Sequence, residues 1–305
     1  MTYSIFSYLN VQVSRKREAG KESTADLYRV VQNRLYRFAA GKPLYWTDIT
    51  EELVDAFAGS LYSEGLAVNT VNSYLSNFRA IYHRAIRERQ VAGRASDPFS
   101  HLRLKREETA KRALKIVEVN KLMQTDYPKE TPRRQALDLF IFCYLACGMP
   151  FVDLAYLKRK NIVGNEIVYH RHKTGVLVRV AITPAMRLLL RKYAGKGSVY
   201  LFPVLTAGHD GYGTYKAALC KQNALLKEIG ELLHLPGKLT SYVARHSWAT
   251  EAIRQNVPVA VISQALGHTS EKTTRIYLDQ LDQSVLNKAN AKITKNVGKM
   301  VLSRA

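Results

Sequence analysis

Residues 239–279 contain an arginine, a histidine and a tyrosine whose spacing could support chemistry on an anionic substrate. The sequence predicts three short helices here, and Gly267 is the residue expected to end the second. Arg245 falls on the first helix, His268 follows the second, and Tyr277 falls on the third. Tight turns between such short helices would bring the three side chains together. We therefore interpret this stretch as the floor of an active site that acts on an anionic group.

The charge of the chain favours a polyanionic partner. Its 305 residues include 46 lysines and arginines against 25 aspartates and glutamates, which gives a formal net charge of +21. Such an excess most simply attracts nucleic acid, and a generally solvated basic surface is the alternative. The length and a hydrophobic content of 47% allow two compact domains or one large one.

Residues 1–94 are predicted to form a small helical domain that binds DNA. Apolar residues recur at helical spacing after Thr50 and again after Asn69. The second of these helices carries Arg79 and Arg84 on its opposite face, where they could contact phosphates. A solvated helix face explains each single arginine about equally well.

A polar and basic stretch follows at residues 95–113. Gly93, just before the stretch, and then Ser96 and the Asp97-Pro98 pair stop the helical pattern, and few residues are expected to anchor a core. We interpret the stretch as an interdomain linker that lies on DNA, and the side chains expected to contact phosphates are Lys105, Arg106, Lys111 and Arg112. A flexible, solvated linker is the alternative.

Residues 114–284 are predicted to form a second, mostly helical domain with one β-hairpin. The run LFIFCYLACGM is apolar nearly all round, which is typical of a helix at the centre of a domain. Two β-branched runs flank Lys173-Thr174-Gly175, which predicts a hairpin with Lys173 at or beside its tip. The expected fold class is therefore mainly α, with a small β-hairpin or sheet in the second domain.

The sequence gives no indication of a metal, a cofactor, export or a membrane. His170 and His172 could share one side of a strand, but two histidines without a third ligand make a poor zinc site. The three cysteines form no CxxC pair, which favours a reducing, cytoplasmic compartment. The longest apolar run is too short to span a bilayer, and the N-terminus lacks the pattern of a signal peptide.

Two runs of the sequence resemble a known family. ARHSWAT, around Arg245, and LGHTSEKTTRIY, which ends at Tyr277, are similar to the C-terminal motifs of the tyrosine recombinases, also called phage-type integrases. The residues of these two runs are most similar to those of the integrases of Bacteroides-type bacteria. The resemblance covers nearly the whole chain, as a core-binding domain, a linker and a catalytic domain. It implies site-specific DNA recombination through a 3′-phosphotyrosyl intermediate, without a metal or ATP.

The resemblance assigns a role to each matching residue. Tyr277 would be the nucleophile, and Arg245 would hold two non-bridging oxygens of the phosphate. His268 would donate a hydrogen bond to the phosphate, and Lys173 would protonate the departing 5′-oxygen. Tyr242 stands where the family usually has a histidine. Its hydroxyl could still donate to a phosphate oxygen, although a packed aromatic side chain is nearly as compatible with this position.

The first arginine of the family is missing from its expected place. The run CGMPFVDL, residues 147–154, offers no arginine on either side of its glycine. Losing one preorganised donor would cost about 3–4 kcal/mol of transition-state stabilisation. Arg171 or Arg179 on the hairpin could replace it; alternatively, the enzyme is slow or depends on its assembly, or the protein binds DNA without cutting it. We favour substitution, and we also count Arg171 among the DNA contacts.

The resemblance also implies the partners of the chain. Residues 285–305 form a tail with one narrow apolar helix face, and such a tail docks on a neighbouring subunit in this family; docking on its own domain is the alternative. We expect a monomer when free and a homotetramer on two duplexes of double-stranded DNA. Two rival functions stay open: a type IB topoisomerase, which relaxes supercoils by similar chemistry, and a non-catalytic DNA-binding protein.

Overall fold

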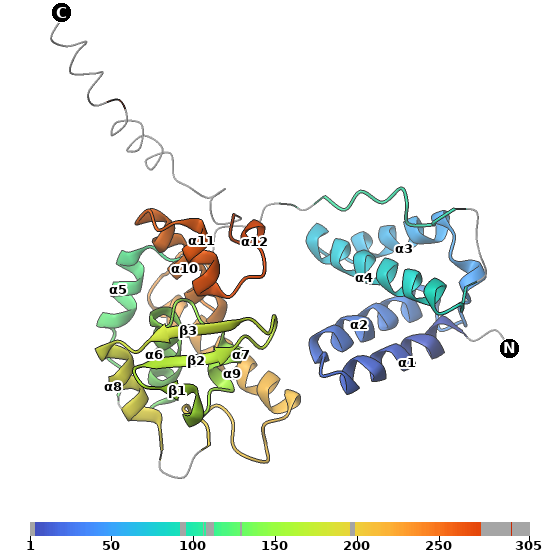
Figure 1. Ribbon diagram of the computed structural model, residues 1–305. Coiled ribbons are helices and arrows are strands. Elements are labelled where there is room, and N and C mark those ends of the chain that lie inside the picture. The colour runs from blue at the N-terminus through green and yellow to red at the C-terminus, as the bar shows by residue number, and fades with distance from the viewer. Residues whose placement is uncertain are drawn as a thin grey trace, which may run out of the picture. The chain divides into compact units, whose positions relative to one another are not determined.

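The computed structural model divides into two compact units, residues 1–109 and 110–305 (Figure 1). The residues that the structure describes are 4–91, 96–105, 107, 113–128, 130–195, 199–275 and 294. Several predicted functional residues lie outside the described residues, namely Tyr277, Arg106, Lys111 and Arg112. The same holds for the predicted tail at 285–305, apart from residue 294.

The first unit, in its described part, consists of four packed α-helices around an aromatic core. The helices are α1 (Ile5–Glu18), α2 (Glu22–Phe38), α3 (Glu51–Ser63) and α4 (Val68–Arg87), with a 3₁₀ turn η1 (Trp46–Asp48) between α2 and α3. Thr50 caps α3, since its hydroxyl accepts a hydrogen bond from the Leu53 N–H at 3.3 Å. Phe57 and Phe78 meet edge to face in the core, with 5.9 Å between ring centroids. The predicted helical character of this unit is confirmed.

Part of the stretch predicted as a linker packs against the first unit. Phe99 is fully buried and lies edge to face with Phe78, with 5.1 Å between ring centroids. The Asn72 side chain on α4 donates a hydrogen bond to the carbonyl of Lys105 at 2.8 Å. The described half of the stretch is therefore part of the first unit rather than a solvated linker, because a buried aromatic ring anchors it.

The second unit is built around one buried helix. Its helices are α5 (Ile116–Gln124), α6 (Pro132–Leu145), α7 (Phe151–Ala155), η2 (Arg159–Asn161), α8 (Pro184–Tyr193), α9 (Tyr212–Leu232), α10 (Ser241–Arg254), α11 (Val259–Leu266) and α12 (Glu271–Arg275). Helix α6 is buried from Ala136 to Cys143 and packs against α8, α9 and α10, which explains why its sequence is apolar nearly all round. None of the helices in the described part of the chain combines the length and apolar character needed to cross a bilayer.

A small antiparallel sheet covers one side of this unit (Figure 1). Its strands, in order, are β1 (Ile162–Val163), β2 (Glu166–His170) and β3 (Leu177–Ala181). The predicted hairpin is formed by β2 and β3, and β1 is an additional edge strand that the sequence did not indicate. Alternate residues of the hairpin are buried, as a sheet with one face on the core requires. The mainly α fold class with a small sheet is confirmed.

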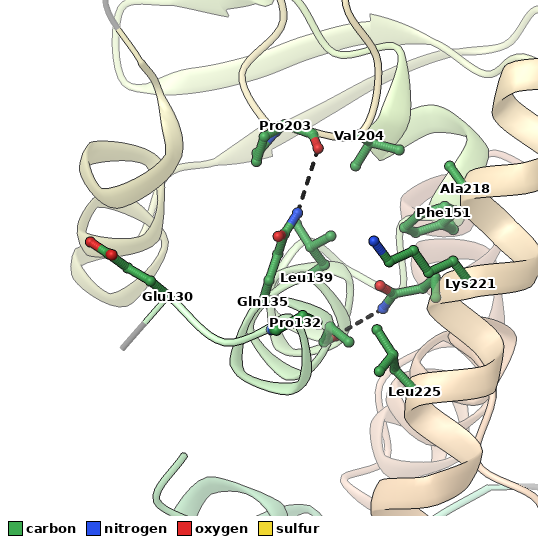
Figure 2. Close-up of a pocket in the computed structure, with 12 residues that line it drawn as sticks. Glu130, Pro132, Gln135, Leu139, Phe151, Pro203, Val204, Ala218, Lys221 and Leu225 are labelled. Atoms are coloured by element: carbon green, nitrogen blue, oxygen red, sulfur yellow. Dashed lines mark hydrogen bonds between the residues drawn. The ribbon is translucent and has the colours of Figure 1, made fainter. Parts of the chain in front are cut away.

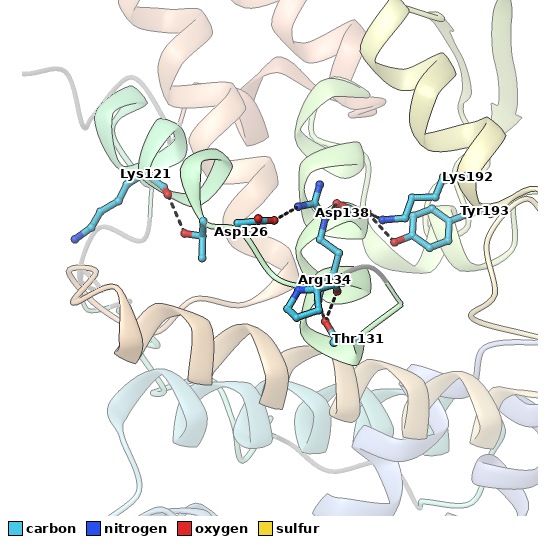
Figure 3. A network of polar contacts seen from close by, with 9 residues as sticks. Lys121, Asp126, Thr131, Arg134, Asp138, Lys192 and Tyr193 are labelled. Atoms are coloured by element: carbon cyan, nitrogen blue, oxygen red, sulfur yellow. Dashed lines mark hydrogen bonds and ion pairs between the residues drawn. The ribbon is translucent and has the colours of Figure 1, made fainter.

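A buried carboxylate joins α6 to α8. Asp138, only 5% exposed, accepts hydrogen bonds from Arg134 Nε at 3.0 Å, Lys192 Nζ at 2.6 Å and the Tyr193 hydroxyl at 2.7 Å. Figure 3 shows Asp138 between the arginine of its own helix and the two side chains at the end of α8. A buried carboxylate is stable only with such partners, so this network fixes α8 against the central helix.

Replacing this carboxylate should destabilise the fold. In Asp138→Ala, one cation and one hydroxyl from α8 lose their acceptor, so we expect the free energy of unfolding in urea to fall by about 1–3 kcal/mol. Asp126→Ala is a matched control, because the Asp126 side chain is 99% exposed and lies 3.9 Å from Arg134. The control should change stability by less than about 0.5 kcal/mol. Equal effects of the two substitutions would contradict the structural role of Asp138.

Candidate active site

Arg245 lies buried at the junction of three helices. It is 3% exposed on α10, and its guanidinium donates to the carbonyl of Gly148 at 3.0 Å and to the carbonyl of Leu266 at 2.6 Å. The first carbonyl follows α6 and the second ends α11. A Cβ atom on Gly148 would lie 2.9 Å from the Arg245 Cα, and Gly148 has a φ of +67°. Only glycine therefore fits this approach, and the orientation of Arg245 is fixed by backbone groups.

His268 lies directly beside this arginine. It follows the left-handed Gly267 that ends α11, as the sequence predicts. Its Nε2 is 3.0 Å from Nη2 of Arg245, and its Nδ1 is 2.8 Å from the hydroxyl of Thr274. Partial burial, and after it the nearby cations Arg245, Arg171 and Lys173, together lower the pKa of His268 to about 4. The imidazole is therefore neutral at physiological pH when no DNA is bound.

Arg171 joins the same site from the hairpin. It follows β2, is 6% exposed and forms an ion pair with Asp153, with 2.6 Å between Nε and Oδ2. Its Nη1 donates to the carbonyl of Leu266, which is also the acceptor for Arg245. Burial raises the pKa of Asp153, and the charge of Arg171 and the backbone N–H of His172 act in the opposite direction. Two guanidinium groups therefore meet at one carbonyl oxygen.

Gly267 makes room for the side chain of Arg171. A Cβ atom at this position would lie 2.7 Å from Cγ of Arg171 and 2.8 Å from Cγ2 of Val178. Its φ of +63° also favours glycine. Gly267, the glycine of the LGH run, therefore has two roles. It ends α11, and its lack of a side chain leaves room for the aliphatic part of Arg171.

The turn that carries Lys173 is fixed on both sides. The backbone N–H of His172 donates to Asp153 at 2.7 Å, and the Thr174 hydroxyl donates to the carbonyl of Gly267 at 3.2 Å. The His172 ring stacks on Tyr156, with 4.9 Å between centroids and 12° between planes. Lys173 itself is exposed in the turn between β2 and β3, where the sequence predicts it. Its backbone is thus held beside the end of α11.

The other predicted residues occupy different surroundings. Tyr242 is 49% exposed on α10 and lies edge to face with His246, at 4.6 Å between centroids. Arg179 is on the outer face of β3, where it pairs with Glu166 at 2.6 Å. The predicted DNA contacts in the first unit are Arg79, which is half-buried on α4, Arg84, which donates to Gln12 at 3.3 Å, and Lys105, which is exposed.

His170 and His172, which make a poor zinc site on the sequence alone, have other partners in the structure. His170 Nδ1 is 2.9 Å from the carbonyl of Gly175, and His172 stacks on Tyr156. Among the residues that the structure describes, no three histidine, cysteine or acidic side chains are grouped as a metal site would require.

A separate pocket of about 240 Å³ lies between α6, α9 and the segment at Pro203 (Figure 2). Figure 2 shows Gln135 reaching from α6 toward the Pro203 carbonyl, and Lys221 on the α9 side. The pocket is lined mainly by apolar side chains and by the amides of two glutamines. None of the predicted catalytic residues within the described part of the chain lines it, so it is separate from the site described above.

Sequence reasoning missed two residues of the site, Asp153 and Thr274. Asp153 is an acid within the otherwise apolar run after Pro150, and a lone acid in an apolar run signals a buried ion pair. Thr274 carries no such signal, because threonine on a short helix is as common on the surface as in the interior. Its partner, His268, becomes evident only from the geometry.

The low pKa of His268 makes stability depend on pH in one window. The unfolded chain takes up a proton on this imidazole near the ordinary value of 6.5, whereas the folded protein does so only at about 4. The contribution of the neutral ring to the free energy of unfolding is therefore fully present above pH 6.5, and it is lost as the pH falls toward 4. In urea denaturation without DNA, His268→Gln should lose less stability than the wild type between pH 7 and pH 4.5. The same pH dependence in both proteins would contradict the burial of a neutral histidine.

The sequence matches two family descriptions. Residues 112–284 match the Phage integrase family, and residues 4–97 match the Phage integrase SAM-like domain. Similar curated proteins include "Tyrosine recombinase XerD" of Rickettsia bellii, 24% identical over 79% of this chain and 83% of that protein. Another is "Tyrosine recombinase XerC" of Roseiflexus castenholzii, 26% identical over 84% of this chain and 82% of that protein.

Solved structures show the same fold. A lambda integrase dimer bound to a COC′ core site matches with a TM-score of 0.64 and 17% identity, over 90% of this chain and 77% of that one. The XerH site-specific recombinase bound to difH matches with a TM-score of 0.62 and 20% identity, over 94% of this chain and 83% of that one. The match to the family covers more than half of the chain and includes Arg171, Arg245 and His268. The chain belongs to the phage integrase family.

Proposed function

We propose that the protein is a site-specific tyrosine recombinase in which Arg171 replaces the missing first arginine. The observation that carries this proposal is the meeting of two buried guanidinium groups at the Leu266 carbonyl, next to His268. Two such groups side by side suit the non-bridging oxygens of one phosphate. The motif around Tyr277 supplies the nucleophile that such a site requires.

Arg171 fits the role of the second phosphate clamp better than Arg179. Arg171 is buried and reaches the carbonyl that also holds Arg245, whereas the Arg179 side chain is 60% exposed and is paired with Glu166 on the other face of the hairpin. Asp153 is buried and forms the ion pair that holds the Arg171 side chain in place. Arg171 therefore takes the place of the missing arginine in the folded site, although it stands at a different point in the sequence.

The reaction we propose is a transesterification. The Tyr277 hydroxyl attacks the scissile phosphorus, so the bond from phosphorus to the tyrosine oxygen forms and the bond to the 5′-oxygen breaks. Arg171 and Arg245 stabilise the negative charge that grows on the non-bridging oxygens. Lys173 gives a proton to the departing 5′-oxygen. Attack by the 5′-hydroxyl of a partner strand on the phosphotyrosine reverses these steps and rejoins the DNA without ATP.

The proposed partner is double-stranded DNA with specific sites. The net charge of +21 supports binding to phosphates, and the first unit presents Arg79 and Lys105 for such contacts. A lambda integrase tetramer bound to a Holliday junction shares the fold, which supports a homotetramer on two duplexes. Tyr242, partly exposed on α10, is a further candidate donor to the phosphate. A chromosomal DNA substrate would place the protein in the bacterial cytoplasm.

Covalent attachment to DNA should require Tyr277. DNA fragments retained by the Tyr277→Phe protein give the binding site, and a nicked suicide substrate built on that site should trap the wild type as a protein–DNA adduct. Tyr277→Phe should bind the same DNA and give no adduct, because the nucleophile is absent. Binding without an adduct in the wild type would favour the non-catalytic protein. Relaxation of supercoils without exchange between two sites would favour a type IB topoisomerase.

Removing Arg171 should reduce cleavage much more than removing Arg179. Arg171→Ala eliminates one phosphate donor, so the rate of adduct formation should fall by about 10²–10³-fold while DNA binding is largely retained. Arg179→Ala is the matched control on the same hairpin and should cleave at nearly the wild-type rate. Arg171→Lys keeps the positive charge beside Asp153 but not the planar fork, so it should fold normally and still cleave slowly. Wild-type cleavage by both Arg171 variants would remove Arg171 from the site.

A further inference from the structure

Thr274 is the buried partner of His268. It lies on α12, is completely buried, and its hydroxyl oxygen is 2.8 Å from Nδ1 of His268. The other ring nitrogen, Nε2, is 3.0 Å from Nη2 of Arg245. The imidazole is therefore held from both sides, by a cation on α10 and by a hydroxyl on α12.

These two contacts determine which nitrogen carries the hydrogen. A guanidinium can only donate hydrogen bonds, so the Nε2 that faces Arg245 must be the acceptor. The ring is neutral in the DNA-free protein, since its pKa is lowered to about 4. Its single hydrogen is then on Nδ1 and is donated to Thr274. Because Thr274 is fully buried, water has no access to replace this acceptor.

The same arrangement prepares Nε2 for a phosphate. A phosphate oxygen that enters between His268 and Arg245 is an anion, which favours the protonated ring. When Arg245 donates to the phosphate instead, the Nε2 lone pair is released and binds a proton from solvent, and Nε2–H can then donate to the phosphate oxygen. The Nδ1–H bond to Thr274 persists in both protonation states, so the ring keeps its orientation throughout.

The position of Thr274 in the sequence links the orientation of the His268 ring to Tyr277, the proposed nucleophile. Thr274 lies three residues before Tyr277 in the sequence, and α12 packs against α11, whose end precedes His268. A displacement of α12 would therefore move the hydroxyl away from the imidazole.

We propose that Thr274 is a positioning residue, which holds His268 with Nε2 toward the scissile phosphate and makes that orientation depend on the placement of α12. This inference rests on the proposed recombinase function. The alternative is that Thr274 only fills space in the interior. Valine has nearly the same shape as threonine but no hydroxyl, so substitution by valine distinguishes a positioning role from a packing role.

The test compares three variants on the suicide substrate. Thr274→Val should lower the rate of adduct formation on the order of tenfold, because one hydrogen bond that orients His268 is lost. Thr274→Ser keeps the hydroxyl and should restore most of the rate. Thr273→Val is the matched control, an exposed threonine on the same helix, and should cleave like the wild type. In a His268→Ala background, Thr274→Val should cause no additional loss.

A spectroscopic measurement keeps the inference independent of cleavage. The ¹⁵N chemical shifts of the His268 ring, assigned with His268→Gln, should show hydrogen on Nδ1 in the wild type and in Thr274→Ser. Thr274→Val should free the ring to turn away from Arg245, so that Nε2 no longer has to accept, and the shifts should then show a mixture of tautomers. Unchanged tautomers together with wild-type cleavage in Thr274→Val, or an equal loss in the His268→Ala background, would overturn the inference. A wild type that forms no adduct would contradict the proposed function, and the tautomer shifts would still decide the role of Thr274.

Discussion

The carbonyl oxygen of Leu266 is the group on which the candidate site depends. It stands at the C-terminal end of α11, where helix carbonyls lack partners within the helix and carry a partial negative charge. Both Arg171 and Arg245 donate to it. Two guanidinium groups repel each other, and this dipole offsets part of that repulsion without neutralising either charge. The helix end therefore holds two cations at one carbonyl oxygen.

The described charged groups of the site have an excess of positive charge. Arg171, Arg245 and Lys173 contribute three positive charges, and Asp153 is an acid paired with Arg171. Burial is the main cause of the low pKa of His268, and the same imbalance adds to it, because an imidazolium would add a fourth positive charge to the cluster. A phosphate diester would relieve the repulsion and make protonation of His268 favourable. In the proposed mechanism, binding of the phosphate would thus convert a neutral histidine into a protonated donor.

The sequence could predict those features that depend on local patterns. Gly267 ends α11 and Lys173 occupies the hairpin turn, because turn and cap chemistry is decided by a few neighbouring residues. Phe99 could not be placed, since its burial depends on the surface of α4 and not on its own neighbours. The choice between Arg171 and Arg179 was open but could have been resolved. Side chains alternate along a strand, so Arg171 continues the inward row of β2, whereas Arg179 lies between two inward valines.

The pair Gly267–His268 explains why the parts of the site are interdependent. Gly267 lacks the Cβ atom that would collide with Arg171, and its carbonyl accepts from Thr174 in the turn that carries Lys173. His268 contacts Arg245 through one nitrogen and α12 through the other. The hairpin, α10, α11 and α12 therefore meet at two consecutive residues. Close packing makes such a junction rigid, so a shift in any one element disturbs the others. This junction gives the candidate site a precision that four separate short elements could not supply independently, and the proposed clamping of a phosphate would need that precision.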